Sequence, residues 1–132
     1  MSESATIKLL KALAEKEGRE TELISLYIPA GHQASEVINL LEEEYGIASN
    51  IKSERTRKNV RDAIAKVAKH IKLFRELPEN GLVIFCGAIP QEDGKERIET
   101  YVIIPEEPIG LFLYCCDSKF HVEPLLRRLK ER

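Results

Sequence analysis

The chain has 132 residues, enough for one domain with a modest hydrophobic core. Hydrophobic residues make up 43% and charged residues 32%, a globular composition, and no apolar run approaches the roughly 20 residues that cross a bilayer. The amino terminus is polar and amphipathic, unlike a secretory signal, and three cysteines, two of them adjacent, do not make a disulfide framework. These features predict a single domain in a reducing, cytoplasmic compartment, without a membrane partner.

The net charge of −2 conceals a strong asymmetry along the chain. Residues 52–75 contain nine Lys or Arg and two Asp or Glu, a local charge of +7, so the rest of the chain carries −9. One basic stretch on an otherwise acidic molecule creates a directional electric field. Such a stretch is either a solvated helix face or a surface for a polyanionic partner, and the charge pattern leaves both open.

The hydrophobic pattern predicts eight elements in the order α-β-α-α-β-β-β-α. Helices are expected where apolar residues recur every three or four positions, and strands where short apolar or alternating runs lie between turn residues. The predicted helices cover residues 4–17, 33–45, 53–77 and 124–130, and the predicted strands cover residues 23–28, 81–89, 96–104 and 110–116. This order predicts an α+β fold, an α/β sandwich in which helices cover a small four-stranded sheet, mixed or antiparallel.

The second and third predicted helices form a hairpin. Gly46 is expected to end the first of the two, so that residues 47–53 make the tip. The longer helix is amphipathic, with an apolar stripe of Val60, Ile64, Val67, Ile71 and Phe74. Its basic side chains fall on the opposite side or flank.

Two other local features are expected. The turn at residues 18–22 is polar and predicted to be exposed. In the strand at 96–104, the alternation predicts that one face is formed by Ile98, Thr100, Val102 and Ile104.

Two short stretches carry polar chemistry that core packing does not require. In Asn-Ile-Lys-Ser at residues 50–53, a lysine stands between short side chains that donate and accept hydrogen bonds, which suits the reading of polar edges. In the other stretch, Tyr114 and Cys116 point to the same side of a predicted strand, and Phe120 follows in a polar turn. These three side chains either bound a pocket for a planar base or belong to an ordinary core rim.

Motifs for catalysis are scarce. The chain has neither a GxxxxGK[ST] phosphate loop nor a GxSxG nucleophile elbow, and no catalytic residue and no cofactor are predicted. Cys115, Cys116 and His121 do not supply four zinc ligands at recognisable spacing, so no metal site is expected. A small thiol enzyme with Cys116 as nucleophile and His121 as its base remains an alternative.

Residues 48–53, Ala-Ser-Asn-Ile-Lys-Ser, resemble the NIKS motif region of the archaeal and eukaryotic class one peptide chain release factors. Tyr114, Cys116 and Phe120 are similar to the YxCxxxF motif of that family, at the family's separation from the first motif. The resemblance extends over nearly the whole chain, and two motifs in the right order make it specific. It implies that residues 1–132 are a single domain, the N-terminal codon-recognition domain of a longer factor.

In that family the two motifs face the stop codon in the ribosomal A site, and the resemblance therefore implies recognition of mRNA and ribosomal RNA. The residues that it assigns to stop-codon recognition are Thr21, Glu44, Ser49, Asn50, Ile51, Lys52, Ser53, Tyr114, Cys116 and Phe120. The residues that it assigns to RNA backbone contacts are Arg55, Arg57, Lys58, Arg61, Lys66 and Lys69. A translational GTPase would bind the full factor through another domain, and the isolated domain is expected to be a monomer.

Glu44 has an independent reason to be singled out. It ends a run of three glutamates in the last turn of a predicted helix, where negative charge opposes the helix dipole at a cost of roughly a few tenths of a kcal/mol. A carboxylate can accept hydrogen bonds from the exocyclic amino groups of bases. The bland alternative is a solubilising acidic patch.

The chain departs from the family pattern in three places. Eukaryotic members carry Gly-Thr-Ser before the first strand, where this chain has Glu20-Thr21-Glu22, and Ile47 stands where a threonine is usual. The family's middle domain carries a Gly-Gly-Gln tripeptide that promotes peptidyl-tRNA hydrolysis, and none of the seven glycines here is next to another.

These departures shape the expected function. The chain is expected to read stop codons without carrying the hydrolytic step, so it is not predicted to be an enzyme. Tyr27, Glu22 and the missing Gly-Thr-Ser run favour the archaeal branch. The alternative is a free-standing ribosome- or RNA-binding regulatory protein without release activity.

Overall fold

The computed structural model describes residues 4–131. Its helices and strands follow the predicted order, which confirms the α+β class. The helices are α1 (Ala5–Ala14), α2 (Ala34–Ala48), α3 (Glu54–Lys72) and α4 (Glu123–Lys130). The strands are β1 (Leu23–Pro29), β2 (Gly81–Pro90), β3 (Glu96–Ile103) and β4 (Leu113–Asp117).

The four strands form one sheet in the order β3-β2-β1-β4. Each neighbouring pair is antiparallel, so the sheet is not mixed. β1 lies between β2 and β4, and all seven of its residues are buried. β2 and β3 are joined by the Asp93-Gly94 turn, where Gly94 has a φ of 83° that favours glycine.

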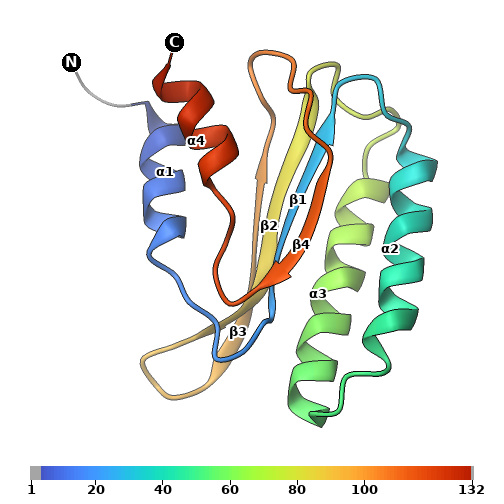
Figure 1. The fold of residues 1–132 in the computed structure, drawn as a ribbon, viewed down its shortest axis with the longest axis vertical. Helices are drawn as coiled ribbons and strands as arrows, with labels where there is room; N and C mark the ends of the chain where they lie inside the picture. The colour runs from blue at the N-terminus through green and yellow to red at the C-terminus, as the bar shows by residue number, and fades with distance from the viewer. Residues whose placement is uncertain (1–3, 132) are drawn as a thin grey trace.

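Helices cover both faces of the sheet. Figure 1 shows α2 and α3 on one side and α1 and α4 on the other. Alternate residues of β1 serve the two layers: Ile24 and Leu26 pack with α2 and α3, whereas Leu23 and Tyr27 pack with the core on the α1 and α4 side. This double burial explains why the central strands read as continuous apolar runs instead of alternating ones.

The helical hairpin differs from its predicted bounds at two ends. α2 passes through Gly46 to Ala48, because Ala48 is buried in the core beneath it. α3 ends at Lys72 instead of residue 77, and Phe74 still packs against the core after the chain has left the helix. The hairpin tip is therefore shorter than predicted and begins at Ser49.

One prediction of exposure is wrong. Glu22, in the turn expected to be exposed, has no solvent-accessible surface. The alternation predicted for β3 is present: Ile98 packs against the core on the α2 and α3 side, and Thr100 contacts Cys86 of that core. Ile103 is buried in the core on the other face, whereas Val102 and Ile104 are exposed.

The loops that carry the predicted recognition residues meet at one end of the molecule. Figure 1 shows the α2–α3 loop, the chain before β1, the end of β4 and the β2–β3 hairpin at this end, with the last turn of α4 at the opposite end. Among residues 4–131, none of the helices has both the length and the apolar character needed to cross a membrane.

Candidate functional site

The loop between α2 and α3 is compact and presents its polar side chains outward. The backbone amides of Asn50 and Ile51 donate to the carbonyls of Ile47 and Ala48 at 3.0 and 3.1 Å, which winds the chain tightly out of α2. Ile51 is half-buried against the core, while Asn50 and Lys52 are exposed. One apolar side chain thus anchors a loop whose polar side chains project into solvent.

The first turn of α3 holds the other side of this loop. Ser53 is the N-cap, and its hydroxyl accepts from the amide of Thr56 at 3.2 Å. Arg57 Nη1 donates to the carbonyl of Ile51 at 2.9 Å. Ser53 is therefore both the start of α3 and the last residue of the recognition loop.

A second group of predicted residues lies where β4 passes beneath α2. Tyr114 and Cys116 both face the α2 and α3 layer, as the alternation predicts. Cys116 Sγ donates to the carbonyl of Thr21 at 3.1 Å, which joins β4 to the chain before β1. Burial raises the pKa of Cys116 to about 11, with further contributions from nearby negative groups, among them the Glu44 carboxylate. Burial also raises the pKa of Tyr114, and the charge of Glu44 adds to the effect. We refer to Thr21, Glu44, Tyr114 and Cys116 as the second cluster: Cys116 contacts Thr21, and the charge of Glu44 acts on Tyr114 and Cys116.

Phe120 does not join that cluster. It lies in the core on the opposite face of the sheet, is 4% exposed, and packs edge-on against Phe85 with ring centroids 5.5 Å apart. The predicted three-sided pocket of Tyr114, Cys116 and Phe120 is thus not assembled on one face. Phe120 fixes the chain that leaves β4.

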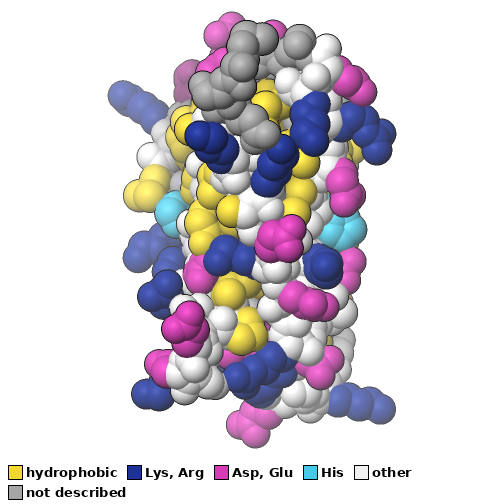
Figure 2. All heavy atoms as spheres, turned by 90° about the vertical axis from the view of Figure 1, so that its left-hand side faces the viewer, with side chains coloured by type: hydrophobic (Ala, Val, Ile, Leu, Met, Phe, Trp, Pro, Cys, Tyr) yellow, Lys and Arg dark blue, Asp and Glu magenta, His cyan; other side chains and the backbone are white. Residues whose placement is uncertain are grey.

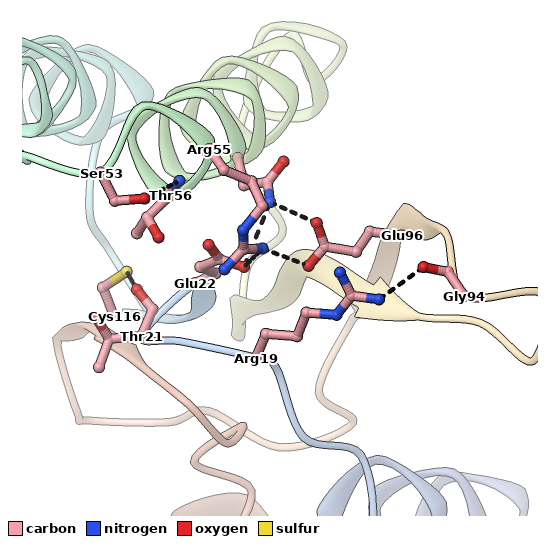
Figure 3. A network of polar contacts seen from close by, with 10 residues as sticks. Arg19, Thr21, Glu22, Ser53, Arg55, Thr56, Gly94, Glu96 and Cys116 are labelled. Carbon is pink, nitrogen blue, oxygen red and sulfur yellow. Dashed lines mark hydrogen bonds and ion pairs between the residues drawn. The ribbon is translucent and has the colours of Figure 1, made fainter.

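A polar network around the buried carboxylate of Glu22, which the sequence did not predict, lies beside the cluster (Figure 3). Arg55 Nη1 lies 3.3 Å from Glu22 Oε1 and 2.8 Å from Glu96 Oε2. Asn59 Nδ2 donates to Glu96 Oε1 at 3.0 Å and lies 3.4 Å from Glu22 Oε1. Within the described residues, Glu22 Oε2 has no hydrogen-bond partner although it is fully buried.

This network ties α3 to the chain before β1 and to the start of β3. Burial alone would raise the pKa of Glu96, but hydrogen bonds from Arg55 and Asn59 outweigh it and hold the pKa below its ordinary value. The available sequence signal was weak: Arg55 and Asn59 are one helical turn apart, so they can share a partner. Nothing local indicated that the partner would be Glu22.

The basic residues of α3 fall into two groups. Arg55 and Arg57 are bound to groups within the domain, as described above. Lys58 pairs with Asp62 at 2.7 Å, and Arg61 lies over the Tyr45 ring, 4.3 Å from its centroid. Three exposed lysines of α3 make no hydrogen bond or ion pair to any residue in 4–131: they are Lys66 and Lys69, which were predicted to contact RNA, and Lys72.

The geometry argues against the thiol enzyme with Cys116 as nucleophile. Cys116 points to the α2 and α3 side of the sheet and has a raised pKa, whereas a nucleophilic thiol needs a lowered one. His121 instead approaches Cys115, with 3.5 Å between Cys115 Sγ and His121 Nε2. The pairing of Cys116 with His121 is therefore not formed.

The comparisons with known proteins agree with this arrangement. A peptide chain release factor subunit 1 from Methanocaldococcus jannaschii is 52% identical over 126 residues, covering 95% of this chain and 30% of that protein. The homologue of the same description from Methanopyrus kandleri is 46% identical, covering 100% of this chain and 34% of its own length. A solved archaeal translation termination factor, aRF1, superposes with a TM-score of 0.78 at 38% identity over 90% of this chain and 33% of that one.

Fold and site together define a three-layered α+β domain, with helices on both faces of one sheet and a recognition loop at the tip of a helical hairpin, of the kind found in archaeal termination factors. The family model described as eRF1 domain 1 matches residues 3–130. The chain belongs to this family, as its N-terminal domain, and spans about a third of the length of the curated relatives it matches.

Proposed function

We propose that this domain recognises stop codons in the ribosomal A site during translation termination. The single observation that carries the proposal is the convergence of the two motif regions at one end of the fold: the α2–α3 loop and the Glu44, Tyr114 and Cys116 cluster. The archaeal relatives described as peptide chain release factor subunit 1 support it.

In this proposal the exposed side chains of the loop contact the codon. Asn50 can donate and accept hydrogen bonds, and Lys52 can donate to a base carbonyl or a phosphate. Ile51 and Ser53 position the loop, through core packing and the α3 cap respectively. Each good base contact contributes about 1–3 kcal/mol of discrimination.

The second cluster reads a later base from the other side. Glu44 accepts from exocyclic amino groups, and the Tyr114 ring offers an edge or face to a neighbouring base. Phe120 acts indirectly, because it is buried on the opposite face of the sheet. Thr21 contributes through its carbonyl, which orients the Cys116 thiol.

The basic residues of α3 also divide into residues that contact RNA directly and residues that position the loop. Lys66 and Lys69 contact the phosphates of ribosomal RNA, and Lys58 and Arg61 add positive charge on the same helix. Arg55 and Arg57 serve mainly to hold the recognition loop and the first turn of α3. Peptidyl-tRNA hydrolysis is left to another part of the full factor, and a translational GTPase binds there also.

Photo-crosslinking tests the proposal. A ribosome is programmed with 4-thiouridine at the first position of a stop codon in the A site, and the attachment is mapped by peptide mass spectrometry. A crosslink within residues 50–53 that is absent with a sense codon is the expected result. Attachment only along α3, equal for stop and sense codons, would instead support the free-standing RNA-binding protein.

A pair of variants separates reading from general binding. Lys52→Ala should reduce the preference for stop over sense codons, whereas Lys66→Ala should weaken binding to both equally. Both lysines are exposed, so neither change disturbs the core. A change in codon preference with Lys66→Ala but not with Lys52→Ala would show that the roles are wrongly assigned.

A further inference from the structure

We propose that Cys115, Asp117 and His121 form a binding site for a divalent transition metal of the Zn²⁺ type. The three residues lie at the end of β4 and in the loop that follows, on the side of the sheet opposite Cys116. One ligand atom from each, a sulfur, a carboxylate oxygen and an imidazole nitrogen, lies within 4.8 Å of both others. This site is separate from the codon-recognition cluster.

The distances suit a tetrahedral ion. Zn²⁺ bonds of about 2.3 Å to sulfur and 2.0 Å to nitrogen or oxygen place neighbouring ligands roughly 3.3–3.6 Å apart at the tetrahedral angle. Cys115 Sγ lies 3.5 Å from His121 Nε2, and Asp117 Oδ2 lies 2.9 Å from the same nitrogen. A small outward movement of the carboxylate opens the space for the ion. The exposure of Asp117 and His121 leaves room for a water as fourth ligand.

The backbone around the ligands is already fixed. The His121 amide donates to Ser25 Oγ at 2.8 Å, and its carbonyl accepts from the Tyr27 hydroxyl at 2.6 Å. Ser25 and Tyr27 belong to the buried central strand β1. Binding therefore requires little ordering of this loop.

The remaining two ligands are held as firmly. Cys115 is paired with Ser25 in the β1–β4 ladder. Asp117 Oδ1 accepts from the amide of Ser118 at 2.7 Å, which turns Oδ2 toward His121 Nε2 and makes Oδ2 the ligand atom.

The same geometry excludes a Cys-His-Asp catalytic triad. In a triad, one imidazole nitrogen faces the nucleophile and the other faces the orienting carboxylate. Here Nε2 faces both the thiol and the carboxylate. Convergence of three donors on one point is the arrangement of a metal site. On binding, the Cys115 thiol releases its proton to solvent and coordinates as the thiolate.

Titration of the tag-free chain with Zn²⁺, followed by calorimetry, tests the proposal, with Co²⁺ as a spectroscopic probe for thiolate and tetrahedral coordination. One ion should bind per chain. Cys115→Ser and His121→Ala should weaken binding more than about tenfold, the loss that even second-shell changes cause. The matched controls Cys116→Ser, on the opposite face of β4, and His70→Ala, on α3, should bind as the unaltered chain does.

A readout on the unaltered protein covers the case in which a variant fails to fold. Zn²⁺ should slow alkylation of Cys115, located by fragment-ion sequencing, and leave the rate at Cys116 unchanged. Absence of stoichiometric binding, equal affinity in Cys115→Ser and His121→Ala, or equal protection of both thiols would each overturn the proposal. Neither the metal titration nor the alkylation experiment depends on ribosome binding, so both outcomes are independent of the proposed function.

Discussion

Glu44 occupies a position that local energetics disfavour. It lies in the last turn of α2, after two exposed glutamates, where the helix dipole repels negative charge. Its charge reaches two side chains that its sequence context did not reveal, Tyr114 and Cys116, and raises the pKa of both. A carboxylate kept against the dipole and beside an aromatic ring is well placed to accept hydrogen bonds from a base.

Replacing this charge should be visible in the thiol beneath it. In a Cys115→Ser background with a chelator present, Glu44→Gln should lower the pKa of Cys116 relative to that background, because burial remains but one negative charge is lost. The measurement is the alkylation rate of Cys116 against pH. Glu42→Gln, an exposed residue on the same helix, is the control. Equal curves for both variants would mean that Glu44 does not face Cys116.

At the scale of elements, Ser53 couples the recognition loop to helix α3. Ser53→Ala removes the N-cap hydrogen bond to Thr56 and should lower the unfolding free energy by about 1 kcal/mol. Ser53→Asp keeps a capping oxygen and should restore most of that stability. Chemical denaturation of the two variants checks this. If the aspartate variant folds normally yet reads stop codons poorly, the Ser53 hydroxyl acts on the codon as well as on the helix.

The β2–β3 hairpin is tied to α3 through Glu96. Glu96→Gln should cost on the order of 1 kcal/mol, since the Arg55 partner is 40% exposed and water screens the pair. The folded-state pKa of Glu96 is lowered, so its contribution is complete above the unfolded value of about 4.3 and is lost as pH falls through the folded value. The difference in melting temperature from the unaltered chain should therefore be largest at neutral pH and vanish in acid.

The control for this pH dependence is Glu92→Gln, an exposed change in the same hairpin. It should shift the melting temperature little at any pH. A Glu96→Gln deficit that persists undiminished in acid would show that the loss comes from packing and not from the ionised carboxylate.

Gly46 lowers the stability of α2, because glycine has a low helix propensity and nothing in the fold requires it at this position. A Cβ added there meets no atom within 4 Å, so Gly46→Ala should stabilise the domain by roughly 0.5–1 kcal/mol through helix propensity. Gly87→Ala is the opposite case, because its Cβ would lie 2.6 Å from the carbonyl of Glu22. Melting temperatures should rise for the first variant and fall for the second. A fall for both would contradict an open helical site at Gly46.

At the scale of the whole molecule, charge is distributed by face. Figure 2 shows the α1 and α4 side, where basic and acidic side chains are interspersed around apolar strips. The basic excess of residues 52–75 lies instead on α3 and the loops at its two ends. A polyanion is therefore drawn to one side of the domain, the side that also carries the recognition loop.

This polarity predicts a measurable salt dependence. In the proposed function, the double change Lys66→Ala and Lys69→Ala should weaken ribosome binding equally for stop and sense codons and reduce the slope of log affinity against log salt by roughly two. Lys8→Ala with Lys11→Ala, on the mixed-charge face, is the matched control and should leave the slope unchanged. Equal slopes for the two double variants would place the RNA contact elsewhere.

Periodicity and turn chemistry by themselves determined the class of this fold. The stripe from Val60 to Ile71, the apolar runs of β1 and β2, and the Asp93-Gly94 turn each report on local geometry, and each element lies where it was expected. Each of the two motifs lies in one short stretch of sequence. The loop at residues 50–53 and the shared face of Tyr114 and Cys116 could therefore be predicted without the structure.

The tertiary structure alone decided which residues that are far apart in the sequence lie together. The burial of Glu22 against Arg55, the separation of Phe120 from Tyr114, and the meeting of Cys115 with His121 each depend on which side of the sheet a distant segment returns to. Even the end of α2 was set this way, since packing of Ala48 outweighed the helix-stopping tendency of Gly46. Local patterns carry the period and the turn, whereas partners brought together by chain reversal leave no regular spacing in the sequence.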